Sequence, residues 1–128
     1  MISSRIRPTK LELAILRILW EKGSASVREI HLALSEGKPT GYTTALKMLQ
    51  IMTEKGLVER DDSTRPQIYR ARHTQKKTQQ HLLKDFVQRA FGGSVKALVM
   101  QALASKKSSR EDLEIIRKLL DKFEGESR

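Results

Sequence analysis

The segment 10–22, KLELAILRILWEK, is apolar on almost every side of the helix that it predicts. Thr9 and Glu12, at its start, have the spacing of a capping box, and Gly23 at its end is a typical C-terminal stop. A surface helix has one apolar face, whereas a helix that is apolar all round is enclosed by other elements. We therefore expect this helix to form the centre of a domain's core.

Two further helices and a β-hairpin are expected next. Ser26 and Glu29 repeat the capping spacing and predict a short helix that ends near Gly37. Thr40 is the expected cap of a third helix. The inward face of that helix is expected to carry Tyr42, Ala45, Leu46, Leu49 and Met52. After Gly56, the runs LVER and PQIYRA favour short strands, and the turn-forming DDSTR between them favours a hairpin.

The helical period returns from Thr74 and predicts three more helices, with Ser94 and Ser108 as the expected caps of the last two. Three helices, a hairpin and three helices are typical of a winged helix-turn-helix followed by a helical module. We predict a mainly α fold with a small β-hairpin, divided into a winged-helix domain (1–73) and a three-helix dimerisation module (74–128). Three short helices bury little surface alone. Dimer contacts are therefore expected from Leu83, Phe86, Leu98, Val99, Ile116 and Leu120.

The composition narrows the function. The chain has 25 Lys and Arg residues against 15 Asp and Glu, and its net charge of +10 favours a polyanionic partner. The absence of cysteine excludes disulfides, thiolate metal sites and cysteine nucleophiles. No apolar run approaches the roughly 20 residues that cross a bilayer, and the N-terminus lacks a signal-peptide core, so a cytoplasmic protein is expected, not a membrane protein. His31, His73 and His81 form no local ligand motif, and we expect no metal, no cofactor and no enzymatic activity.

The residues on the outward face of the third predicted helix are mostly small and uncharged. Thr43, Thr44 and Lys47 lie there, and such a ridge can enter a major groove, where Thr contacts phosphate or thymine and Lys contacts guanine or phosphate. In the alternative interpretation, the two threonines only bond to local backbone in the first helical turn. The candidate DNA-binding residues are Thr40, Thr43, Thr44, Lys47, Gln50, Arg65, Arg7 and Lys10. An adaptor that binds protein, and RNA or the ribosome through its basic surface, is the alternative function.

The segments PTKLELAILRILWEKGSASVREIHLAL, GYTTALKMLQIMTEKGLVER and IYRA resemble the penicillinase-repressor family, which includes the BlaI/MecI group and the copper-responsive CopY repressors. The resemblance implies a homodimeric repressor whose winged helix binds palindromic double-stranded DNA operators of the TACA/TGTA type. It also implies that Thr43, Thr44 and Lys47 belong to the reading helix and Arg65 to the wing. Family members often carry Arg where this chain has Ile51, so operator preference is expected to differ. Copper sensing through a cysteine cluster is excluded.

The same resemblance implies a route for release from DNA. In this family a membrane-anchored metalloprotease sensor triggers cleavage in the C-terminal helices, within a segment that aligns with ALVMQAL here. The scissile bond would then lie between Gln101 and Ala102, where studied members have Asn–Phe. In the alternative interpretation, Val99, Ala102 and Leu103 are plain helix core. Removal of a dimer module converts a bivalent binder into two weak ones, which lowers avidity by about 10²–10⁴.

Overall fold

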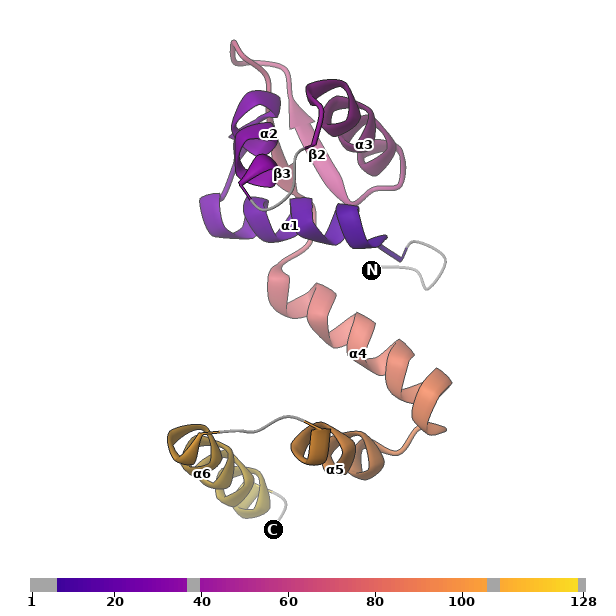
Figure 1. Ribbon diagram of the computed structural model, residues 1–128, viewed down its shortest axis with the longest axis vertical. Coiled ribbons are helices and arrows are strands. Elements are labelled where there is room, and N and C mark those ends of the chain that lie inside the picture. Colours follow the sequence, from indigo (N-terminus) through magenta and orange to yellow (C-terminus); the bar gives the residue numbers. More distant parts are fainter. Residues whose placement is uncertain (1–6, 37–39, 106–108, 127–128) are drawn as a thin grey trace. The chain divides into compact units, whose positions relative to one another are not determined.

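The computed structural model describes residues 7–36, 40–105 and 109–126, which form a mainly α fold with one small sheet (Figure 1). Two compact units are present, Met1–Asp85 and Phe86–Arg128. The elements in chain order are α1 (Lys10–Lys22), β1 (Ala25–Ser26), α2 (Val27–Ser35), α3 (Tyr42–Glu54), β2 (Val58–Asp61), β3 (Ile68–Ala71), α4 (Gln75–Phe91), α5 (Val95–Ser105) and α6 (Arg110–Glu126). The predicted mainly α fold class is confirmed, and the predicted element order holds except for the additional strand β1.

The first two helices begin at the predicted capping boxes. The Glu12 N–H donates to the Thr9 hydroxyl at 3.3 Å, and the Thr9 N–H donates to the Glu12 carboxylate at 2.8 Å. Ser26 and Glu29 exchange the same pair of bonds at 3.2 and 2.9 Å. Gly23 ends α1 with φ of 85°, a backbone conformation that suits glycine. The two residues of each capping box lie within four consecutive positions, so the sequence alone was enough to locate the starts of both helices.

The sheet has three strands, one more than the predicted hairpin. β1 pairs antiparallel with β3, and the strand order is β1-β3-β2. The backbone of Tyr69, in the central strand, lies opposite Ala25 on one side and Arg60 on the other. The sequence analysis did not predict β1, because a strand of two residues is too short to show an alternating pattern. Its pairing with β3 in the structure identifies it as a strand.

The core of the N-terminal unit is built around α1, as predicted. Its buried members come from all three helices and from the sheet. They are Ile15, Leu16, Leu19, Ala25, Ile30, Leu49, Met52, Leu57, Val58 and Tyr69. Trp20 packs at the margin of this core and donates its indole N–H to the carbonyl oxygen of His73, at 3.0 Å. This bond holds the segment that leads into α4 against the end of α1.

The C-terminal helices are separated by short breaks. Gly92 and Gly93 have φ of 57° and 88° and end α4. Ser94 caps α5 as predicted, because its hydroxyl accepts from the Ala97 N–H at 3.1 Å. Ser108, the predicted cap of α6, lies outside the described residues, and it is the Ser109 hydroxyl that accepts from the N–H of Asp112, at 3.0 Å. The two compact units divide within α4, and the domain boundary between residues 73 and 74 stays a prediction.

Candidate nucleic-acid interface

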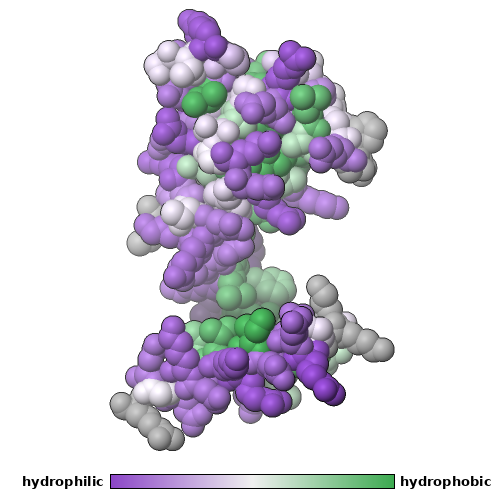
Figure 2. All heavy atoms as spheres, turned by 90° about the vertical axis from the view of Figure 1, so that its left-hand side faces the viewer, coloured by the Kyte–Doolittle hydropathy of each residue, from purple (hydrophilic) through white to green (hydrophobic). Residues whose placement is uncertain are grey.

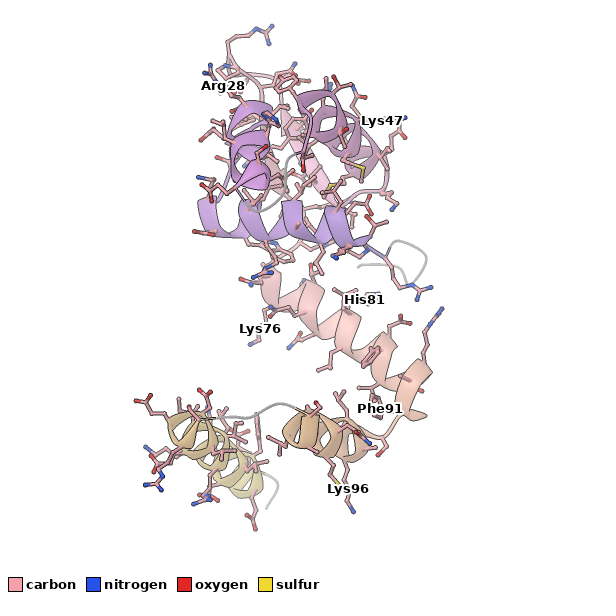
Figure 3. The ribbon with its side chains drawn as sticks, in the orientation of Figure 1. Arg28, Lys47, Lys76, His81, Phe91 and Lys96 are labelled. Atoms are coloured by element: carbon pink, nitrogen blue, oxygen red, sulfur yellow. The ribbon has the colours of Figure 1, made fainter. Side chains whose placement is uncertain are left out.

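The two faces of α3 differ sharply in burial. Ala45, Leu49 and Met52 are fully buried and fix the helix to the core. On the opposite face Thr43 and Lys47 are exposed, with Thr44 beside them, and Figure 3 shows Lys47 on the outer side of the helix. Because the side chains of Thr43 and Thr44 are short, a partner surface can approach the helix backbone closely beside them.

The start of α3 corrects two predictions. Gly41, not Thr40, is the N-cap, and it forms no side-chain capping bond. The Thr40 carbonyl oxygen instead accepts from the Ser35 hydroxyl at 3.3 Å, which closes the turn after α2. Tyr42, predicted to face inward, is 49% exposed and packs edge-to-face on His31 with ring centroids 5.7 Å apart. Tyr42 is the first helical residue, and the buried face of α3 begins one turn later, at Ala45.

A buried ion pair fixes the other end of α3. The Lys55 ammonium lies 2.8 and 3.1 Å from the two carboxylate oxygens of Glu12 in the first turn of α1. Burial raises the pKa of Glu12, but hydrogen bonds from Lys55 and Thr9 outweigh this, and the net shift is downward. The pair ties α3 to α1 and sets the position of the exposed face. Sequence reasoning missed it because Glu12 and Lys55 are 43 residues apart and only the capping role of Glu12 is local.

The wing, defined as β2, β3 and the turn between them, carries internally paired charges. Arg60 contacts Asp62 at 2.7 Å, and Arg70 contacts Asp61 at 3.3 Å. Asp61 also accepts from the Ser63 hydroxyl and N–H, which lowers its pKa. Arg65 is exposed in the turn, and no ion pair to it occurs in the part of the chain that the structure describes. Arg65 is therefore the wing arginine best placed to meet an anion.

The remaining DNA-binding candidates lie in different environments. Gln50 is exposed on α3, and Lys10 is exposed at the start of α1. Arg7 contacts Asp85 of α4 at 3.3 Å. The structure thus places Arg7 against a carboxylate, and its part in DNA binding stays a prediction. Arg28, which the prediction did not include, is exposed in the first turn of α2 (Figure 3).

The C-terminal unit exposes much apolar surface, visible as green in Figure 2. Of the six predicted dimer residues, Leu83, Phe86, Val99 and Leu120 are exposed in the single chain, whereas Leu98 and Ile116 are half-buried. No described residue of α5 or α6 is buried. Gln101 and Ala102 are exposed within α5. An isolated chain thus leaves these helices without a core of their own.

Other site chemistry is limited in the described ranges. Residues 7–36, 40–105 and 109–126 contain no group of three His, Asp or Glu side chains placed to hold a metal ion. None of their helices is both long and apolar enough to cross a bilayer. The exposed face of α3 and the wing, together with the basic side chains around them, therefore remain the candidate partner-binding features of the described residues.

The chain is similar to known proteins over most of its length. A sequence profile of the penicillinase repressor family matches residues 8–122. The penicillinase repressor of Staphylococcus aureus is 21% identical over 121 residues, which cover 94% of this chain and 96% of that protein. The solved structure of reduced AbfR bound to DNA aligns with a TM-score of 0.42 and 19% identity, over 94% of this chain and 75% of that chain. The profile match spans both compact units.

Proposed function

The chain belongs to the penicillinase repressor family, and from this membership we propose that it is a homodimeric transcriptional repressor that binds palindromic operators through α3 and the wing. Repression is the function that the family description and the name of the S. aureus relative share. The observation that carries the proposal is the exposed face of α3, where Thr43, Thr44 and Lys47 stand on a helix anchored at three buried positions.

The residue types on this face suit a major groove. A threonine offers a hydroxyl to phosphate or base edges and a methyl group to thymine, while Lys47 can reach guanine or phosphate. Arg65 in the wing supplies a phosphate contact that does not depend on sequence. The net charge of +10 supports attraction to a duplex at long range. By the family resemblance, the operator is of the TACA/TGTA type.

Dimerisation is proposed through the C-terminal unit. The exposed apolar side chains of α4, α5 and α6, including Phe86, Val99 and Leu120, are the surface that a second copy would cover. A two-fold dimer presents two α3 helices to half-sites about one helical turn apart, roughly 10 bp, so a palindrome is the matching operator. Bivalent binding then gives an affinity that one winged helix alone does not reach.

Release is proposed to occur by cleavage between Gln101 and Ala102, after a signal from a membrane-anchored sensor protease. Both residues are exposed, so a protease can reach the surface on which they lie. They sit within α5, and cleavage requires that this helix opens locally to an extended chain. In a single chain no described residue of α5 is buried, so the packing that opposes this opening is the packing that the proposed dimer would supply.

A competition experiment tests the DNA-binding proposal. Fluorescence anisotropy would measure binding of the full chain to a labelled TACA/TGTA palindrome, with a scrambled duplex and structured RNA as competitors at two salt concentrations. We expect preference for the palindrome that persists at the higher salt, because base contacts survive when phosphate attraction is screened. Equal competition by RNA and scrambled DNA would favour the alternative, an adaptor with a basic surface.

A further inference from the structure

A second polar surface borders the start of α3, and no base-reading residue belongs to it. Arg28 and His31 are three residues apart on α2, so both side chains lie on one side of that helix. The His31 ring contacts the Tyr42 ring edge-to-face, at 5.7 Å between centroids and 81° between planes. Arg28 thus shares one side of α2 with His31, and His31 connects that side to Tyr42, the first residue of α3; we call this surface the strip.

The strip is positively charged and accessible. Arg28 is exposed, and within the described ranges it takes part in no ion pair. Its neighbour Glu29 is committed to the capping box, where its carboxylate accepts from the Ser26 N–H at 2.9 Å. Hydrogen bonds from Ser26 lower the pKa of Glu29. About half of the Tyr42 surface is exposed, although its ring is fixed on one side by His31.

The end of α3 beside this strip also favours an anion. Gly41 provides no side-chain cap, and no acidic residue lies in the first turn of the helix. The first backbone N–H groups of α3 therefore have no intrahelical acceptor and no competing carboxylate. A cationic side chain, a phenol hydroxyl and these N–H groups are the donors that bind a phosphodiester in protein–DNA complexes.

We propose that Arg28 and Tyr42, with His31 holding the Tyr42 ring, bind the operator's phosphate backbone beside the bases that α3 reads. This inference rests on the proposed function and adds a contact to it. The contact positions α3 in the groove and carries no sequence information, because every duplex presents the same phosphates. His31 acts through Tyr42 and is a positioning residue.

The test compares variants on two duplexes. Arg28→Ala should weaken binding to the palindrome and to a scrambled duplex by the same factor, roughly fivefold. It should also lower the slope of log affinity against log salt by about 0.9, the value of one phosphate contact. Arg17→Ala is the matched control, because Arg17 is equally exposed but lines a groove between α1 and α2, beside Gln75. It should leave the slope unchanged.

The roles of Tyr42 and His31 are tested by separate substitutions. Tyr42→Phe keeps the ring and removes the hydroxyl, so affinity should fall about threefold with an unchanged salt slope. His31→Ala should reduce affinity by a similar factor in the wild-type background and by nothing in the Tyr42→Phe background. Additive losses would mean that His31 only stabilises the fold, and would overturn its assigned role.

Modified DNA locates the contact. Replacing single phosphates by neutral methylphosphonates should reveal one position at which Arg28→Ala causes no further loss. If Arg28→Ala and Arg17→Ala behave alike on every duplex, the backbone contact is refuted even though the wild type still prefers the palindrome. If the wild type shows no preference for the palindrome while the Arg28→Ala slope still falls, the proposed operator fails and the backbone contact stands.

Discussion

Replacing Lys55 by methionine should destabilise the N-terminal unit while keeping the packing of its aliphatic side chain. In the wild type the Lys55 ammonium supplies two contacts to Glu12, at 2.8 and 3.1 Å. The variant removes both and leaves a carboxylate whose side chain is 0% exposed. Hydrogen bonds from Thr9, including one from its N–H at 2.8 Å, still partly compensate the buried charge.

The size of the effect follows from the exposure of the two partners. Breaking a fully buried ion pair costs about 3–5 kcal/mol, whereas an exposed pair contributes about 0–1 kcal/mol. The Lys55 side chain is 33% exposed, which places this pair between the two limits. We expect a loss of about 2 kcal/mol in the free energy of unfolding. For a domain of roughly 60–100 residues this corresponds to a fall in Tm of about 8–16 °C.

The pH dependence has a definite sign. The pKa of Glu12 is lowered in the folded wild type, so the unfolded chain binds more protons and stability falls as the pH drops. This contribution is complete above the unfolded glutamate pKa of about 4.3 and is lost below it. Without Lys55, burial is opposed by the hydrogen bonds of Thr9 but by no ammonium from residue 55, so the pKa of Glu12 should be higher than in the wild type, and protonation of the carboxylate should reduce the cost of burying it. The stability gap should be largest near neutral pH and should already be narrower at pH 4, which lies below the unfolded glutamate pKa of about 4.3.

Urea unfolding of the full chain at fixed protein concentration, followed by circular dichroism at pH 7 and pH 4, measures both effects. Lys76→Met is the matched control, because Lys76 is exposed on α4 and takes part in no ion pair among the described residues. The m value should be unchanged, so a lower midpoint reports stability. A midpoint for Lys55→Met equal to that of Lys76→Met, or a gap as wide at pH 4 as at pH 7, would refute the reasoning.

Three further predictions concern function. Lys47→Ala should weaken operator binding by about 1–3 kcal/mol while sparing scrambled DNA. Arg65→Ala should weaken binding to the operator and to scrambled DNA alike, and should flatten the dependence of affinity on salt. Unchanged gel-shift affinity in the two variants would reject this surface. Leu120→Glu should convert dimer to monomer in sedimentation, while the equally exposed Leu32→Glu in α2 should not; a dimeric Leu120→Glu chain would count against the C-terminal interface. A cell-wall antibiotic should produce a shortened chain on immunoblots as the target genes switch on, and a chain that stays at full length during induction would eliminate cleavage.

Short-range signals in this chain predicted structure well. The Thr9 and Ser26 capping boxes both form, because each needs only four consecutive residues to bond. The apolar period of α3 identified its buried positions at Ala45, Leu49 and Met52, and hence the exposed face opposite. The period could not show where along the helix the core stops. The helical period places Tyr42 on the inward side of α3. Tyr42 is, however, the first residue of the helix and lies beyond the end of the core, so its side chain is half exposed.

Contacts between residues that are far apart in the chain could not be predicted from the sequence pattern. Lys55 meets Glu12 and Arg7 meets Asp85 across long stretches of chain, and no local motif records either pair. Arg28 has no distinctive neighbours in sequence, and only the structure shows that His31, three residues further along α2, packs on Tyr42 of α3. The apolar residues of the C-terminal helices could be recognised in the sequence, but the second copy that is proposed to cover them is not part of a single chain.

Trp20 is the single tryptophan of the chain, and its bond to the His73 carbonyl makes it a built-in optical probe. Its indole lies partly against the core, and the bonded carbonyl belongs to the segment that enters α4. If the start of α4 lifts from α1, the indole exchanges a protein acceptor for water, and its emission should move to longer wavelength. Unlabelled protein can therefore reveal, in a stopped-flow fluorimeter, whether the start of α4 stays seated while the operator is captured or released.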